Sequence, residues 1–210
     1  MVSFANEEIR AELQRKYASS FKATFAPCTH FIGIDVQYDR EHGVLKLTQG
    51  SYIKRAAEQL LSADELAAAA PSTPSCKDLD KLTGPQELGR LPKCSASLHH
   101  DYRVRVGTLL YISVTCMPGL AHCAGKLGRA SANPSERLRD MTNQALRWVY
   151  HHREEGLEYR RDASAELVAH SDSDWCIKHA AAAWVVALCG AVVSWASKRE
   201  RCVALDRIKH

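Results

Sequence analysis

HSDSDW at His170–Trp175, VSWASK at Val193–Lys198 and VAL at Val203–Leu205 are the stretches that decide the fold of the C-terminal part of this sequence. Each reads as a short β-strand. Because side chains two positions apart in a strand share a face, Asp172 and Asp174 are expected on one face of the resulting sheet. Phosphodiester cleavage by two metal ions requires several converging carboxylates, and the chain ends before more can arrive. The pattern therefore predicts a sheet with an incomplete acidic site.

The composition is that of a folded protein of one or two domains. The chain has 210 residues, of which 46% are hydrophobic, so it can bury a core. Its formal charge of +4 suits nucleic acid but is common among soluble proteins. No apolar run is long enough to span a bilayer, and the start lacks a basic region followed by an apolar core. We expect a cytoplasmic or nuclear protein that does not contact membranes.

The cysteines are scattered, without a Cys-x-x-Cys pair, and we expect reduced thiols. The eight positions are Cys28, Cys76, Cys94, Cys116, Cys123, Cys176, Cys189 and Cys202. An alternative is a zinc site made from Cys116, His122 and Cys123, but the spacings of the usual zinc motifs are absent. The expectation is therefore that no cofactor or metal is bound.

The N-terminal half reads as a helix, a hairpin and a second helix. Asn6 can cap a helix that runs to about residue 20. Residues 31–38 and 44–49 are strand-like and flank a polar loop that ends in glycine, which predicts a β-hairpin. Ser51 is the next cap candidate, and its helix is expected to continue through an alanine-rich stretch until Pro71.

A linker and two further helices are expected after Pro71. Residues 71–100 contain turn formers and little periodicity, so the principal domain boundary is placed there. Apolar residues recur at helical spacing from Asp101 and again from about Ser135. The run His151–Glu155 has the residue types of a metal or acid–base cluster, but we interpret its mixed charges as a solvated helix end.

The order of these motifs resembles the Pol polyprotein of copia-type retrotransposons. The matching stretches are Phe31–Val36 (FIGIDV), Tyr102–Ile112 (YRVRVGTLLYI), Asn133–Pro134, Ala145–Trp148 (ALRW), Ser171–Trp175 (SDSDW), Val193–Lys198 and Val203–Leu205. The resemblance implies an α+β fold in three parts. These are the palm end and thumb of a reverse transcriptase at 1–90, connection helices at 91–165, and the truncated start of a ribonuclease H-like antiparallel sheet at 166–210.

The resemblance also implies that both catalytic centres are incomplete. Asp172 aligns with a nuclease carboxylate of the family, which uses Mg²⁺, and Asp174 is a second candidate nearby. Lys209 stands where the next metal-binding glutamate is expected, and an ammonium group there repels metal ions. The Asp-Asp pair of the polymerase does not occur between Met1 and His30. We therefore expect a catalytically inactive fragment.

Basic side chains are the remaining candidates for contact with nucleic acid. They are Lys46, Lys54, Arg55, Arg147 and Arg153. By the resemblance, their partner is an RNA–DNA hybrid or a duplex, bound weakly through phosphates and without sequence preference. The alternative is that they only solvate the surface. Two other functions stay open: a segment of an active RNA-directed DNA polymerase with ribonuclease H activity, whose remaining parts lie outside this chain, and a repurposed protein-binding module.

The three C-terminal strands also predict a poorly covered sheet. A sheet that ends at Leu205 lacks the later elements that would cover the face carrying Trp175, Trp184 and Trp195. We expect this end to be loose or sticky unless the alanine-rich segments compensate.

Overall fold

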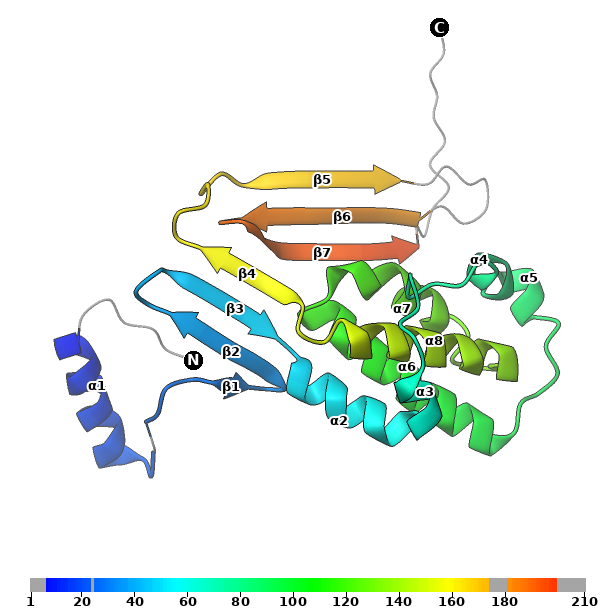
Figure 1. Cartoon of the computed structure of the whole chain (residues 1–210), viewed down its shortest axis with the longest axis horizontal. Coiled ribbons are helices and arrows are strands. Elements are labelled where there is room, and N and C mark those ends of the chain that lie inside the picture. Colours follow the sequence, from blue (N-terminus) through cyan, green and yellow to red (C-terminus); the bar gives the residue numbers. More distant parts are fainter. Residues whose placement is uncertain (1–6, 24, 174–180, 200–210) are drawn as a thin grey trace, which may run out of the picture.

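Two antiparallel sheets and a group of helices form the protein (Figure 1). The computed structural model describes residues 7–23, 25–173 and 181–199. Every strand pair within these residues is antiparallel. The expected α+β class is therefore confirmed. The helix expected to about residue 20 is α1 (Glu7–Ser20).

The first sheet contains the predicted hairpin and a strand from much later in the chain. Its strands, in spatial order, are β1 (His30–Phe31), β2 (Ile34–Asp39), β3 (Val44–Thr48) and β4 (Gly156–Arg160). The first hairpin strand was expected to begin at Phe31, but it begins at Ile34. Ile32 and Gly33 turn the chain between them, with φ angles of 47° and 72°. Leu47 pairs with Leu157, and Val36 pairs with Leu47, so apolar residues line up on one face.

Helix α2 (Gly50–Leu60) ends earlier than predicted, and a separate helix α3 (Ala63–Ala67) follows it. The break is a capping box. The Ser62 hydroxyl accepts the backbone N–H of Glu65 at 3.2 Å, and the Glu65 carboxylate accepts the N–H of Ser62 at 2.8 Å. The single helix expected up to Pro71 was therefore wrong.

The predicted linker at 71–100 is packed against the helices. It contains two short helices, α4 (Leu79–Leu82) and α5 (Pro85–Leu88). Leu79 is only 2% exposed and belongs to the main core. Residues 71–100 are therefore not an extended linker, because their turn formers separate short packed helices. The domain boundary placed in this segment stays a prediction.

The two helices predicted from about Asp101 and Ser135 are α6 (Ala96–Thr115) and α8 (Glu136–His151). Serine hydroxyls at Ser95 and Ser135 cap their N-termini. Between them lie η1 (Pro118–Leu120) and α7 (Ala121–Gly128), which periodicity did not predict. Within the described residues, no helix is long and apolar enough to cross a bilayer.

One hydrophobic core joins helices from both sides of residue 90. Its largest fully buried members are Ile53, Leu79, Tyr102, Leu109, Ile112, Leu120, Leu127, Leu138, Leu146 and Val149. The Tyr102 hydroxyl donates to the carbonyl of Leu127 at 2.7 Å, so even the aromatic member satisfies its polar atom. The predicted boundary at residue 90 therefore does not separate two hydrophobic cores. The assignment of residues 1–90 and 91–165 to different parts of an ancestral polyprotein stays a prediction.

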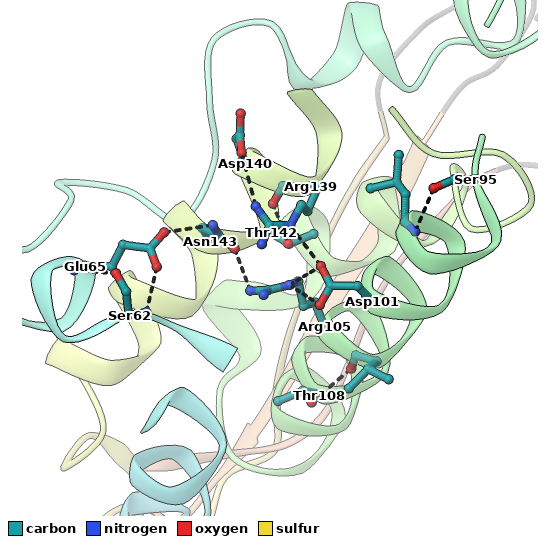
Figure 2. A network of polar contacts seen from close by, with 12 residues as sticks. Ser62, Glu65, Ser95, Asp101, Arg105, Thr108, Arg139, Asp140, Thr142 and Asn143 are labelled. Atoms are coloured by element: carbon teal, nitrogen blue, oxygen red, sulfur yellow. Dashed lines mark hydrogen bonds and ion pairs between the residues drawn. The ribbon is translucent and has the colours of Figure 1, made fainter. Parts of the chain in front are cut away.

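A polar network joins α3, α6 and α8 (Figure 2). The Arg105 side chain is only 5% exposed, and its Nε donates to both Asp101 carboxylate oxygens at 3.0 Å. Arg139 donates to Asp101 from α8 at 2.9 Å. Asn143 accepts from Arg105 at 2.6 Å and donates to Glu65 at 2.9 Å. Because the buried Arg105 and Asn143 side chains of this network have partners, the network fixes the register of the three helices.

The second sheet lies on the helices and contains a strand that was not predicted (Figure 1). Its spatial order is β5 (Val168–Ser173), β6 (Ala181–Leu188) and β7 (Ala191–Arg199). The alanine-rich β6 is the central strand, whereas the predicted strand at Val203–Leu205 lies outside the described residues.

Trp184 and Trp195 lie on opposite faces of this sheet, since Trp184 pairs with Ala196 and Trp195 pairs with Val185. The Trp195 indole donates to the carbonyl of Ser113 on α6 at 2.7 Å. Its face is therefore docked on the helices. Trp184 is on the outer face, where the Lys198 ammonium lies 5.1 Å from its ring centre. Trp175 lies outside the described residues.

Candidate functional site: a basic cleft beside Asp172

Asp172 lies on the face of the second sheet that is turned toward α7. It pairs with Ala183 on β6, which pairs with Ser197 on β7, so the three side chains form one row. At the end of this row, the Ser197 hydroxyl lies 3.4 Å from Nδ1 of His122 on α7. Asp174, the second predicted carboxylate, lies outside the described residues.

A cleft of about 460 Å³ opens between this face, α7 and the α4–α5 segment. Its charged and polar lining residues are Asp80, His122, Lys126, Arg129, Asp172, Ser197 and Arg199. Three basic side chains and two carboxylates thus line the same cleft. The alanines of β6 at Ala181–Ala183 leave the floor of the cleft open.

Asp80 and Lys126 form an ion pair that joins α4 to α7. The hydrogen bond from Lys126 lowers the pKa of the Asp80 carboxyl, so this carboxylate is ionised near neutral pH. Burial, and then the positive charge of Lys126, lowers the pKa of His122. The imidazole is therefore neutral at pH 7, and it adds hydrogen-bonding capacity rather than charge.

Arg129 and Arg199 bring two guanidinium groups to the same cleft. Burial lowers the pKa of Arg129, the positive charge of Arg199 lowers it further, and the negative charge of Asp80 partly opposes both. Within the described residues, the Arg129 side chain has neither an ion pair nor a hydrogen bond. The Arg129 group stays charged at pH 7, because guanidinium does not lose its proton in that range. The cleft therefore holds like charges that favour an anion.

Magnesium, which the family resemblance implies, does not fit this donor set. A pair of divalent ions needs several carboxylates close together. Within the described residues, no group of three Asp, Glu, His or Cys side chains is placed to hold a metal. The carboxylates of the cleft, Asp80 and Asp172, share it with three cations. We therefore derive no metal-dependent step for this site.

Ser197, His122 and Asp80 have the residue types of a hydrolytic triad, but the geometry does not assemble one. The Nε2 of His122 lies 3.9 Å from the Asp80 carboxylate, which is longer than a hydrogen bond. The same carboxylate oxygen is taken by Lys126. The imidazole is therefore not oriented as a base toward Ser197.

The alternative zinc site of Cys116, His122 and Cys123 is also not assembled. Both thiols are buried, and burial raises the pKa of Cys116 to about 11 and that of Cys123 to about 12. The Cys123 thiol donates to the carbonyl of Pro74 at 3.3 Å. Protonated thiols facing the core and a histidine facing the cleft do not converge on a metal.

The predicted phosphate-binding residues occupy several different places. Lys54 and Arg55 are exposed on α2, and Lys46 on β3 lies between Gln37 and Glu158. Arg147 donates to the carbonyl of Ala69 at 2.6 Å, and Arg153 donates to the carbonyl of Tyr150 at 2.8 Å. These last two side chains are engaged within the protein.

The cleft residues Lys126, Arg129 and Arg199 were not among the predicted candidates. A signal for two of them was present, because Lys126 and Arg129 are three positions apart and share one side of a helix. That signal could not be recognised from the sequence, because helix α7 was not predicted. Arg199 required the register of β7 against its neighbour.

Known proteins that are similar to this chain include one effector protein and two transposon proteins. Secreted RxLR effector protein 161 of Plasmopara viticola is 32% identical over 109 residues, which cover 50% of this chain and 77% of that protein. The retrovirus-related Pol polyprotein from transposon TNT 1-94 of Nicotiana tabacum is 24% identical over 213 residues, covering 93% of this chain and 15% of the polyprotein. A transposon Ty5-1 protein of Saccharomyces cerevisiae is 24% identical over 200 residues, covering 92% and 59%.

The chain thus spans less than two thirds of the length of either transposon protein. No protein-family model matches it, and no solved structure matches it significantly. The match to the Plasmopara viticola protein places the chain in that protein's family, and the likeness to both transposon proteins over more than nine tenths of its length identifies a distant retrotransposon-related origin.

Proposed function

We propose that this transposon-derived chain binds the phosphate backbone of nucleic acid weakly, without sequence preference, and neither cleaves nor copies it. The observation that carries the proposal is the cleft beside Asp172, which Lys126, Arg129 and Arg199 line together with the carboxylates of Asp80 and Asp172. Lysine and arginine bind phosphate oxygens through charge-assisted hydrogen bonds.

The exposed residues Lys54 and Arg55 on α2 supply further phosphate contacts in this proposal. Arg147 and Arg153 contribute less, since their guanidinium groups already donate to backbone carbonyls. Such contacts carry no sequence information, because every nucleotide has the same phosphate. The expected binding is therefore weak and dependent on salt.

The assignment of parts of the chain to particular domains of a retrotransposon polyprotein belongs to the same proposal. The copia-type assignment places the end of a reverse transcriptase at 1–90, a connection at 91–165 and the start of a ribonuclease H domain at 166–210. The antiparallel β5–β6–β7 sheet, with Asp172 on its first strand, supports the last assignment. A competing function is a segment of an active polymerase. In-frame genomic sequence that encodes an Asp-Asp strand upstream and a glutamate-bearing helix downstream would favour that alternative.

The test uses the purified full chain with a fluorescently labelled RNA–DNA hybrid. Binding is titrated at several salt concentrations, and the expected slope of log affinity against log salt is about −0.9 for each phosphate contact. Magnesium or manganese is then added to look for cleavage. Absence of binding at low salt, binding indifferent to salt, or cleavage that is lost in Asp172→Asn would contradict the proposal.

A further inference from the structure

The Arg129 side chain lines the cleft but makes no hydrogen bond or ion pair within the described residues. It follows the last residue of α7, and its side chain is half-buried. Within the described part of the chain, no carboxylate lies within ion-pair distance of it, since Asp80 pairs with Lys126 and acts on Arg129 only as a more distant negative charge. A half-buried guanidinium that contacts no carboxylate, next to a second guanidinium, is stabilised when an anion joins it.

The surroundings leave room for such an anion. The floor of the cleft is lined by the small residues Ala181–Ala183. Lys126 is positioned one helical turn before Arg129, and its side chain is only 15% exposed. The neutral His122 imidazole can donate one further hydrogen bond.

We infer that the cleft between α7 and the second sheet is an oxyanion site that takes one phosphate group, with Arg129 as its principal ligand and Lys126 and Arg199 beside it. The inference rests on the proposed function, for which it names the point of contact. The guanidinium plane presents paired N–H donors that match two phosphate oxygens, which is why arginine serves this role better than lysine.

Asp172 allows a second test, in which the expected change in anion affinity is opposite to that for Arg129. Its carboxylate lines the same cleft, and it has no ion pair within the described residues. A negative charge there repels an incoming phosphate but would attract a divalent cation. Removal of this charge should therefore strengthen the binding of an anion.

The primary experiment measures the affinity of the full chain for inorganic phosphate, followed by NMR chemical shifts at fixed ionic strength. Arg129→Gln should weaken binding about tenfold or more, which corresponds to the loss of one charge-assisted hydrogen bond. Asp172→Asn should tighten it. Arg103→Gln is the matched control, because it removes the same charge from an exposed position on α6 outside the cleft.

An unchanged affinity in Arg129→Gln, or equal losses in Arg129→Gln and Arg103→Gln, would overturn the inference. Circular dichroism of each variant checks that the fold is intact. If Arg129→Gln does not fold, the Asp172→Asn variant decides alone. Weaker phosphate binding, or affinity equal to that of the parent chain, would then refute the oxyanion site.

A second set of measurements identifies the source of the phosphate and separates this inference from the proposed function. Hybrids with a 5′-phosphate and with a 5′-hydroxyl are compared. Preference for the phosphorylated end assigns a terminal phosphate, whereas equal affinities that both fall in Arg129→Gln assign a backbone phosphate. Phosphate binding without hybrid binding would retain the site and refute the proposed function. Hybrid binding that is indifferent to Arg129→Gln would do the reverse.

Discussion

The Asp35 carboxylate on β2 accepts the backbone N–H of Ser51 at 2.9 Å and so caps α2 from a neighbouring strand. The residue at the N-cap position, Gln49, makes no capping hydrogen bond with its side chain. The expectation that Ser51 itself caps the helix was therefore wrong. A strand residue satisfies the helix terminus, and the first sheet and the helical core are thereby joined by a charge-assisted hydrogen bond.

Asp35→Ala should lower the free energy of unfolding by about 1 kcal/mol, the usual effect of losing a helix cap. Ser51→Ala is the matched control. It should cost less, because the backbone N–H that Asp35 accepts is still present. Urea unfolding of the two variants measures the difference. A larger loss for Ser51→Ala than for Asp35→Ala would assign the cap to the serine.

Asp101→Asn should destabilise the protein by about 3 kcal/mol, because it leaves the Arg105 guanidinium buried without its counter-charge. Arg105→Met should cost less, since the partly exposed Asp101 keeps its hydrogen bond from Arg139. Chemical denaturation of both variants gives the order. The reverse order would show that Asp101 is stabilised mainly by water rather than by Arg105.

Acid should destabilise the fold through Asp101 and Glu65. Burial alone would raise the pKa of Asp101, but hydrogen bonds from Arg105 and Arg139 outweigh it and lower the pKa. The backbone N–H of Ser62 is the main cause that lowers the pKa of Glu65. Carboxyls with lowered pKa bind fewer protons when folded. Their stabilisation is therefore complete above the unfolded values of about 4 and is lost as the pH falls through the folded values.

The corresponding measurement is the free energy of unfolding at several pH values between about 6 and 2, within the titration range of carboxyls. The Asp101→Asn variant should show a shallower decline with acid than the parent chain. An identical slope would mean that Asp101 titrates alike in the folded and unfolded states.

Trp195→Phe should loosen the second sheet by about 1 kcal/mol, since it removes the indole hydrogen bond to Ser113. Hydrogen exchange should quicken in β6 and β7 but stay slow in α6 and α8. Trp184→Phe is the control, because that indole lies on the outer face of the sheet. Fast exchange throughout β6 and β7 in the parent chain would support the expectation of a loose end and contradict this docking.

Two glycines should respond oppositely to alanine. A Cβ at Gly107 on α6 would have no neighbour within 4 Å, and Gly107→Ala should stabilise the helix by about 0.5–1 kcal/mol. A Cβ at Gly156 would collide with the Leu47 carbonyl, so Gly156→Ala should cost about 1–3 kcal/mol by forcing β4 away from β3. Thermal unfolding of the pair checks both signs.

Several elements were predictable because their signals are local. Ser95 and Ser135 both cap helices with apolar stripes, although only the second was read as the start of its helix. The break after α2 also had a local signal, Ser62 followed three residues later by Glu65, which the alanine-rich run obscured. The 71–100 segment was misread because its helices are too short to show periodicity.

The sequence by itself determined the α+β class, the hairpin, the two long helices and the position of Asp172 on a strand, because caps and side-chain periodicity act within a few residues. The pairing of β4 with β3 and the gathering of Lys126, Arg129 and Arg199 beside Asp172 were decided only by the tertiary structure. These contacts join residues far apart in the chain. Their register follows from the burial of the shared core, which no local pattern encodes.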